Sequence, residues 1–155
     1  MKCRKTGVII YLVVDDNTCF LIMRYERNED TEALLKQIIA QTEDFFDLRA
    51  MEPKICVLDC EQKKLSEGRM VYADIKPVQE QYKALIDFDY ILTVYTPCTA
   101  LLSDRQFKIL LEHELRHVNI KNGPKGIIFG TVGHDIEDFY AIINKYGMDW
   151  STIDA

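Results

Sequence analysis

The stretch that decides the fold prediction is SDRQFKILLEHELRHV, residues 103–118. Ser103, with Gln106 three positions later, has the capping-box pattern, in which two side chains satisfy backbone N–H groups at the start of a helix. After this cap, apolar residues recur at helical spacing, at Phe107, Leu110, Leu111, Leu115 and Val118. The pattern predicts a helix over about residues 104–118 with one face in the core.

Two histidines lie four residues apart on this predicted helix, in His113-Glu114-Leu115-Arg116-His117. Side chains at this spacing project from one helix face, so both imidazoles can bind one metal ion. Glu114 then lies beside the remaining coordination position, where it can take a proton from a water molecule and pass it to a leaving group. Zinc accepts imidazole ligands and brings the pKa of its water to about 7. The spacing predicts one Zn²⁺ ion on His113 and His117, with Glu114 as the general base.

A third metal ligand is expected shortly after the motif. The chain has three histidines, and the remaining one, His134, follows the Gly-rich turn 130–133. Catalytic zinc sites commonly have three protein ligands and a water, so His134 is predicted as the third ligand and Asp135 is its rival. If His134 binds zinc, Asp135 or Asp138 is expected to orient a ligand through a hydrogen bond.

Composition favours a soluble globular protein. The 155 residues are 48% hydrophobic and 28% charged, which suits one domain with its own core. The net charge is −6 and the basic residues are scattered, so no nucleic-acid partner is expected. The apolar run 8–14 is far shorter than the roughly 20 residues of a membrane span, and it lacks a signal-peptide cleavage site. We therefore expect a cytoplasmic protein that is not bound to membranes.

The cysteines predict reduced thiols. Their number is five, and their spacing does not suggest a disulfide framework. Cys56 and Cys60 form a C-x3-C pair, which could hold a metal. We favour two small buried side chains on one face of a strand, because no second pair accompanies them.

The remaining pattern predicts an α+β domain with one small mixed sheet packed against helices. Turn residues 15–18 between two β-branched or aromatic runs favour an N-terminal hairpin. Residues 61–69 are expected as a loop, residues 122–126 as a break, and Thr31 as a helix cap. The expected helices are 31–46, 104–118 and 135–146, and the expected strands are 8–14, 19–23, 54–60, 70–75 and 90–96.

The second half resembles the putative phage metallopeptidase family of small zincin-like proteins. The similar segments are residues 90–95, 102–106, 111–118 and 133–139, together with Tyr146-Gly147 and Trp150. The likeness covers about residues 24–150, and residues 1–23 are expected as an added N-terminal hairpin within a single domain of residues 1–155. The resemblance implies a minimal zincin fold, one zinc ion, and peptidase activity on a peptide or protein. It also implies His113, His117 and His134 as ligands and Glu114 as the general base.

Two further site predictions concern substrate and transition state. In zincins a strand beside the motif helix often binds substrate by edge pairing. Strand 90–96, with Tyr90, Leu92 and Val94, is the candidate, and a core strand is the alternative. Tyr140 or Tyr146 could stabilise an oxyanion, the alternative being that aromatic residues at helical spacing belong to the core.

The leading hypothesis is therefore a zinc-dependent metallohydrolase, most simply a peptidase. One alternative is a zinc-stabilised binding or regulatory protein of phage or prophage origin that turns nothing over. Another is hydrolysis of a different amide, since the same chemistry would serve it.

Overall fold

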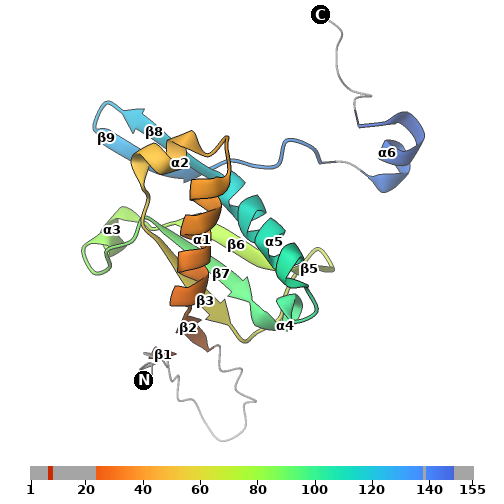
Figure 1. The fold of residues 1–155 in the computed structure, drawn as a ribbon, viewed down its shortest axis with the longest axis horizontal. Coiled ribbons are helices and arrows are strands. Elements are labelled where there is room, and N and C mark those ends of the chain that lie inside the picture. Colours follow the sequence, from red (N-terminus) through yellow and green to blue (C-terminus); the bar gives the residue numbers. More distant parts are fainter. Residues whose placement is uncertain (1–6, 9–23, 138, 149–155) are drawn as a thin grey trace, which may run out of the picture.

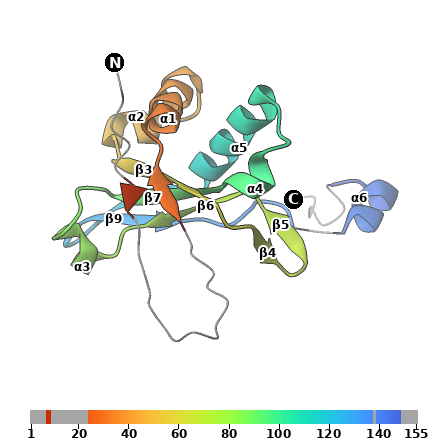
Figure 2. The same ribbon diagram turned by 90° about the horizontal axis from the view of Figure 1, so that it is seen from below.

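A computed structural model of the chain describes residues 7–8, 24–137 and 139–148. It has an α+β fold, as predicted, with a five-stranded sheet in the order β1-β2-β3-β7-β6. Helices α1 (Glu29–Gln41) and α5 (Asp104–Arg116) lie side by side over one face of that sheet (Figures 1 and 2). The strands of the sheet are β1 (Gly7–Val8), β2 (Tyr25–Arg27), β3 (Ile55–Cys60), β6 (Ala73–Pro77) and β7 (Tyr90–Tyr95).

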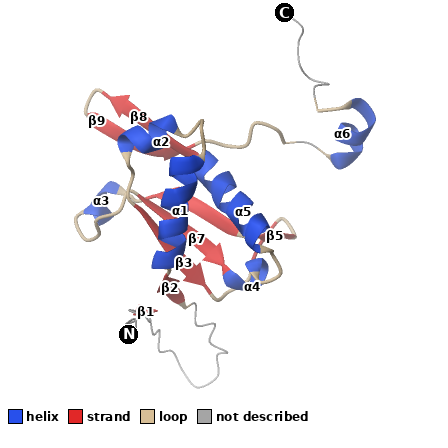
Figure 3. Cartoon of the chain, in the orientation of Figure 1, coloured by secondary structure: helices blue, strands red, loops and turns tan. Residues whose placement is uncertain are grey.

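The sheet is mixed, and two hairpins accompany it. Strands β3 and β7 are parallel, whereas β2 and β6 are antiparallel to their neighbours. The hairpins are β4–β5 (Lys64–Ser66 and Arg69–Val71) and β8–β9 (Val118–Gly123 and Gly126–Thr131). Short helices complete the fold (Figure 3): α2 (Phe46–Met51), α3 (Glu80–Lys83), α4 (Thr96–Thr99) and α6 (Tyr140–Tyr146).

The main core lies between the sheet and the two long helices. Leu111 and Leu115 of α5 are almost fully buried, and they belong to the same cluster as Leu35 of α1. The sheet contributes Val57, Ala73, Ile75, Tyr90, Leu92 and Val94 to this cluster. The apolar stripe of residues 104–118 therefore faces the core as predicted, and burial of this stripe holds α5 against the sheet.

The prediction that residues 90–96 form the substrate-binding edge strand is wrong. Strand β7 pairs with β3 on one side and with β6 on the other, and Tyr90, Leu92 and Val94 are buried in the core. A nearly continuous apolar run is typical of such a central strand. The edge next to α5 is β6, whose Pro77 is a residue that sheets tolerate at an edge.

Several element boundaries also differ from the predictions. Asn28, not Thr31, caps α1, because its side chain accepts a hydrogen bond from the Thr31 backbone N–H. That helix ends at Gln41, and residues 61–69 contain parts of the β4–β5 hairpin where a loop was expected. The motif helix ends at Arg116 and continues directly into β8, and the final helix starts at Tyr140 rather than 135.

The predicted N-terminal hairpin lies outside the described residues apart from the short strand β1. Within the described part of the chain, Cys56, Cys60 and Cys98 are buried free thiols. Burial raises the pKa of Cys56 to about 11, as expected for a thiol with a structural role. No helix among the described residues has the length and apolarity required to cross a bilayer.

Candidate metal centre

The helix that carries the motif has a well-defined start. The Gln106 backbone N–H donates to the Ser103 hydroxyl at 3.2 Å, and the Ser103 N–H donates to Oε1 of Gln106 at 2.9 Å. Both halves of the predicted capping box are therefore present. Such a cap satisfies N–H groups that have no partner within the helix, so it fixes where the helix begins.

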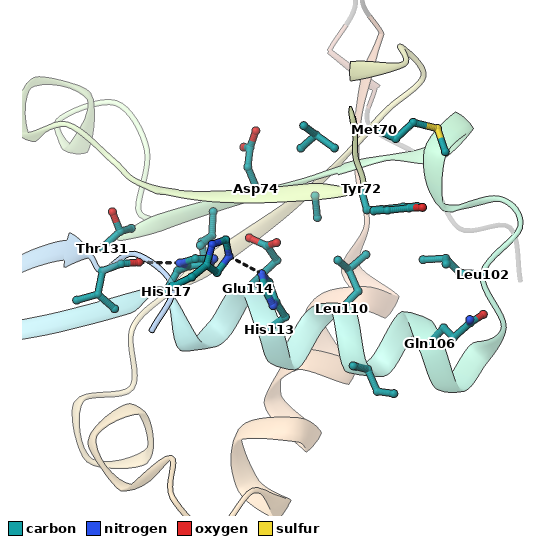
Figure 4. A pocket seen from close by; sticks show the side chains of 16 residues that line it. Met70, Tyr72, Asp74, Leu102, Gln106, Leu110, His113, Glu114, His117 and Thr131 are labelled. Carbon is teal, nitrogen blue, oxygen red and sulfur yellow. Dashed lines mark hydrogen bonds between the residues drawn. The ribbon is translucent and has the colours of Figure 1, made fainter. Parts of the chain in front are cut away.

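The fold brings all three histidines of the chain together. His113 lies in the last turn of α5, His117 caps that helix, and His134 follows the β8–β9 hairpin. Their ligand nitrogens lie within 4.8 Å of one another, and the Nε2 atoms of His113 and His134 are 3.0 Å apart. Nitrogens about 2 Å from a tetrahedral zinc ion lie about 3.3 Å from each other. The three imidazoles can therefore hold one metal ion with little rearrangement. Figure 4 shows His113 and His117 beside Glu114.

A backbone carbonyl orients one of these rings. Nδ1 of His117 is 2.7 Å from the Val132 carbonyl oxygen, and the Val132 N–H donates to the His117 carbonyl at 2.8 Å. A carbonyl only accepts hydrogen bonds, so Nδ1 carries the proton and Nε2 keeps its lone pair for a metal. The same pair of bonds attaches the end of β9 to the end of α5. Sequence patterns did not reveal this orienting group, because a backbone carbonyl has no residue signature.

Burial and neighbouring imidazoles favour the neutral form of His113. Its pKa is lowered first by burial and then by the nearby His117 and His134. A neutral imidazole is the form that binds a metal, so this shift favours His113 as a ligand.

Glu114 lies between α5 and the edge strand β6. Its side chain is buried, and its carboxylate accepts a hydrogen bond from the Ile75 backbone N–H. Burial and the negative charge of Asp74 raise the pKa of Glu114 to about 7, against the effect of that hydrogen bond. Such a pKa suits a group that accepts and returns a proton near neutral pH.

Among the described residues, the histidine group does not include Asp135, the rival proposed as third ligand. Asp135 is exposed and lines a separate pocket of about 260 Å³, which Arg116 and Asp44 also line. The structure therefore does not support Asp135 as third ligand or as an orienting group. Asp138 lies outside the described residues.

The tyrosines proposed as oxyanion stabilisers are also not brought to the site. Tyr140 and Tyr146 are 85% and 57% exposed, and their helix α6 lies apart from the sheet and from α5 (Figure 1). The residues that line the cavity at the histidines include neither of them. The suggested role in stabilising an oxyanion has no support in this arrangement.

A cavity of about 620 Å³ opens along α5 beside the histidines. Its polar end carries His113, Glu114, His117 and His134, while Ala73, Asp74 and Ile75 of β6 form the facing wall. Its other end, towards the start of α5, is lined mainly by apolar side chains (Figure 4). The β6 wall was not predicted as part of the site, because its residues 73–77 carry no motif.

The edge of β6 faces this cavity with its backbone. The Tyr72 carbonyl accepts a hydrogen bond from the Tyr95 N–H, and the Val78 N–H donates one to the Asp89 carbonyl. The even-numbered residues of this segment therefore direct their backbone hydrogen bonds towards β7 and the residue just before it. In an antiparallel pair alternate residues bond in opposite directions, so Ala73 and Ile75 direct their N–H and C=O groups away from β7. The hydrogen bond from Ile75 to Glu114 agrees with this direction. Among the described strands, β6 pairs with β7 alone.

Comparison with known proteins identifies one family for the chain. No curated protein and no solved structure gives a significant match to the chain. The model of one family, described as "Putative phage metallopeptidase", matches residues 23–154. That match includes α5, the three histidines and the cavity walls. The chain belongs to the Putative phage metallopeptidase family.

Proposed function

We propose that this protein is a zinc-dependent peptidase in which His113, His117 and His134 hold the metal and Glu114 is the general base. The observation that carries the proposal is the convergence of three imidazoles, with ligand atoms within 4.8 Å of one another, beside a buried glutamate. Membership of a metallopeptidase family supports a metal and a peptide or protein substrate.

The set of donor atoms favours zinc. Three neutral imidazoles suit a borderline-soft ion, whereas Mg²⁺ and Ca²⁺ prefer oxygen ligands. Three protein ligands leave a fourth position on the cavity side, as in catalytic zinc sites. When bound there, zinc would supply Lewis-acid polarisation of a carbonyl and lower the pKa of a coordinated water.

Glu114 would perform the proton transfers. Its carboxylate would accept a proton as a water oxygen forms a bond to the carbonyl carbon of the peptide. It would then return that proton to the amide nitrogen as the C–N bond breaks, so that an amine and a carboxylic acid are released. The Ile75 N–H, which donates to this carboxylate, would hold it in position during both transfers.

The edge of β6 that pairs with no other described strand would bind the substrate backbone. Ala73 directs its N–H and C=O groups towards the cavity, and an extended peptide could form two hydrogen bonds there. Ile75 already donates to Glu114, so the peptide would pair next to the general base. This assignment replaces β7 with β6 as the substrate-binding edge strand.

The test combines metal analysis with hydrolysis of a fluorogenic peptide library. Glu114→Gln should keep one zinc per chain and lose hydrolysis by a factor of about 10² or more. Glu112→Gln is the matched control, because Glu112 lies on the same helix and bonds to Arg116 outside the cavity. It should keep both zinc and activity. Full hydrolysis by the Glu114→Gln protein would contradict the proposed general base, and loss of activity without loss of a biological effect would favour a binding or regulatory function.

A further inference from the structure

The cavity continues past Glu114 into an apolar section. Towards the start of α5, the side chains that line it are Leu110, Ile109 and Gln106, with Leu102 just before the helix. Met70, Val71 and Tyr72 line the opposite wall, from β5 and the link to β6. Figure 4 shows Leu110, Leu102, Tyr72 and Met70 on the same side of His113 and Glu114. We call these seven residues the apolar section.

Two of these apolar side chains are exposed to solvent. Ile109 is 54% exposed and Met70 is 43% exposed, although each lines a concave surface. Exposed apolar area costs free energy in water, about 25 cal/mol per Å². Exposed apolar area inside a hollow is typical of a surface that binds a ligand.

The apolar section contains no formally charged side chain among the residues described for it. Its one amide, on Gln106, already accepts from the Ser103 backbone N–H in the capping box. A charged substrate side chain would lose its water there without gaining an ion pair, and this loss is costly. A large apolar side chain would lose little and would cover Ile109 and Met70.

The edge of β6 would direct substrate side chains towards this section. Ala73 and Ile75 point their side chains towards α5, where they contribute to the core cluster. In an extended peptide paired with that edge, every second side chain points to the same side of the sheet. Because Ala73 is small, it leaves space between β6 and Leu110 of α5 for such a side chain.

We propose, on the basis of the proposed peptidase function, that the apolar section is the specificity pocket of this enzyme. It accepts a large uncharged apolar side chain, such as that of Leu, Met or Phe, from the residue next to the scissile bond. The substrates are therefore peptide segments with a bulky apolar residue at the cleavage point. Ile109 and Met70 are the specificity-determining residues, because they are the exposed apolar side chains that such a residue would cover.

The first experiment measures cleavage by the wild-type zinc protein of peptides that differ at one residue beside the scissile bond. We expect kcat/KM for Leu or Phe to exceed that for Ala, Lys or Glu by at least about tenfold. Ile109→Arg should remove most of this preference and raise relative cleavage of the Glu peptide. The matched control is Ile128→Arg, at an isoleucine that is 56% exposed and lies outside the cavity lining. Its preference should equal that of the wild type.

A binding measurement separates failure of this inference from failure of the proposed function. Fluorescence anisotropy of the same labelled peptides with the Glu114→Gln protein should show tighter binding of the Leu and Phe peptides by about tenfold. Ile109→Arg in that background should abolish the difference. Selective binding without wild-type hydrolysis would overturn the peptidase function but keep the apolar pocket. Cleavage or binding of the Lys or Glu peptides at least as strong as that of the Leu and Phe peptides would overturn the proposed specificity pocket. Failure to bind any of the peptides would overturn it as well.

Discussion

The buried hydroxyl of Tyr90 donates a 2.8 Å hydrogen bond to the backbone carbonyl of Gly130. Tyr90 lies on the central strand β7 and is fully buried, whereas Gly130 lies on β9, shortly before Val132 and His134. The Tyr90 ring also contacts Phe129 edge-on, with 5.9 Å between ring centroids. The core of the domain therefore anchors the hairpin that precedes His134. Just after that hairpin, the Val132 carbonyl contacts Nδ1 of His117.

Replacing Tyr90 by Phe should weaken metal binding from a distance. The substitution removes the hydrogen bond that the half-buried Gly130 carbonyl accepts, at a cost of about 1 kcal/mol. A looser β9 would hold Val132 and His134 less firmly, so we expect zinc affinity to fall by about tenfold, as for other groups that orient ligands. Competition with a fluorescent chelator measures the affinity, and thermal unfolding measures the stability.

Tyr95→Phe is the control for that prediction. Tyr95 is also buried, but its hydroxyl donates to Asp74 at 2.9 Å and accepts from Lys64 at 3.2 Å, and neither partner belongs to the β8–β9 hairpin. It should lower the melting temperature without changing zinc affinity. Equal zinc affinity in Tyr90→Phe and wild type would show that the hairpin needs no anchor from the core.

His134→Ala should release the metal, and Asp135→Ala should not. The Nε2 atom of His134 lies 3.0 Å from that of His113, whereas Asp135 lines a different pocket. Removing one of the three proposed ligands should reduce zinc affinity by several orders of magnitude, because a two-ligand site loses both enthalpy and preorganisation. Mass spectrometry of metal content after dialysis measures the result. Full zinc retention by His134→Ala would rule out the three-histidine site.

The local signals predicted the motif helix and the common face of its two histidines. The capping box and the apolar stripe depend on residues within one helix, so its start at residue 104 could be placed before any tertiary contact was known, whereas its end at Arg116 could not. The two motif histidines share a face for the same reason. His134 was predicted because it is the one further histidine of the chain, and the hairpin β8–β9 supplies the return that brings it to His113.

Features that depend on tertiary pairing were not predicted. Strand order is set by contacts between distant segments, so the burial of β7 between β3 and β6 could not be obtained from its own apolar run. The same limit applies to the Val132 carbonyl and to the Ile75 N–H, since every residue has these backbone groups. The pKa of Glu114 also depends on its placement beside Asp74 across the β6 strand.

Removing the helix cap should lower stability but spare the metal site. Ser103→Ala removes the acceptor of the Gln106 N–H, which should cost about 1 kcal/mol and a few degrees of melting temperature. Ser66→Ala, at an exposed serine in β4, is the control and should change little. The cap lies at the far end of α5 from His113, so zinc content should stay at one per chain. A loss of zinc in Ser103→Ala would mean that the whole helix must be intact to form the site.

Glu114→Gln should stabilise the metal-free protein at alkaline pH. The folded-state pKa of Glu114 is raised to about 7 from the ordinary value of 4.5, because the carboxylate is buried near Asp74. Between these two values the folded state binds more protons than the unfolded state, so the contribution of Glu114 to stability falls as pH rises from 4.5 to 7. Above pH 7 the buried carboxylate costs about 3 kcal/mol relative to its protonated form. The neutral amide of Gln avoids this cost and can still accept from the Ile75 N–H.

The measurement is thermal unfolding with a chelator present, for wild type and Glu114→Gln, at pH 4.5 and pH 8. The variant should match wild type at pH 4.5 and exceed it by several degrees at pH 8. Comparing the two proteins at each pH cancels the contribution of the histidines, whose protonation is common to both. Glu112→Gln, outside the cavity on the same helix, should show no such gain. The stability difference between Glu114→Gln and wild type could instead be the same at both pH values. Glu114 would then titrate as an ordinary carboxyl, and its burial would not adjust its pKa for proton transfer.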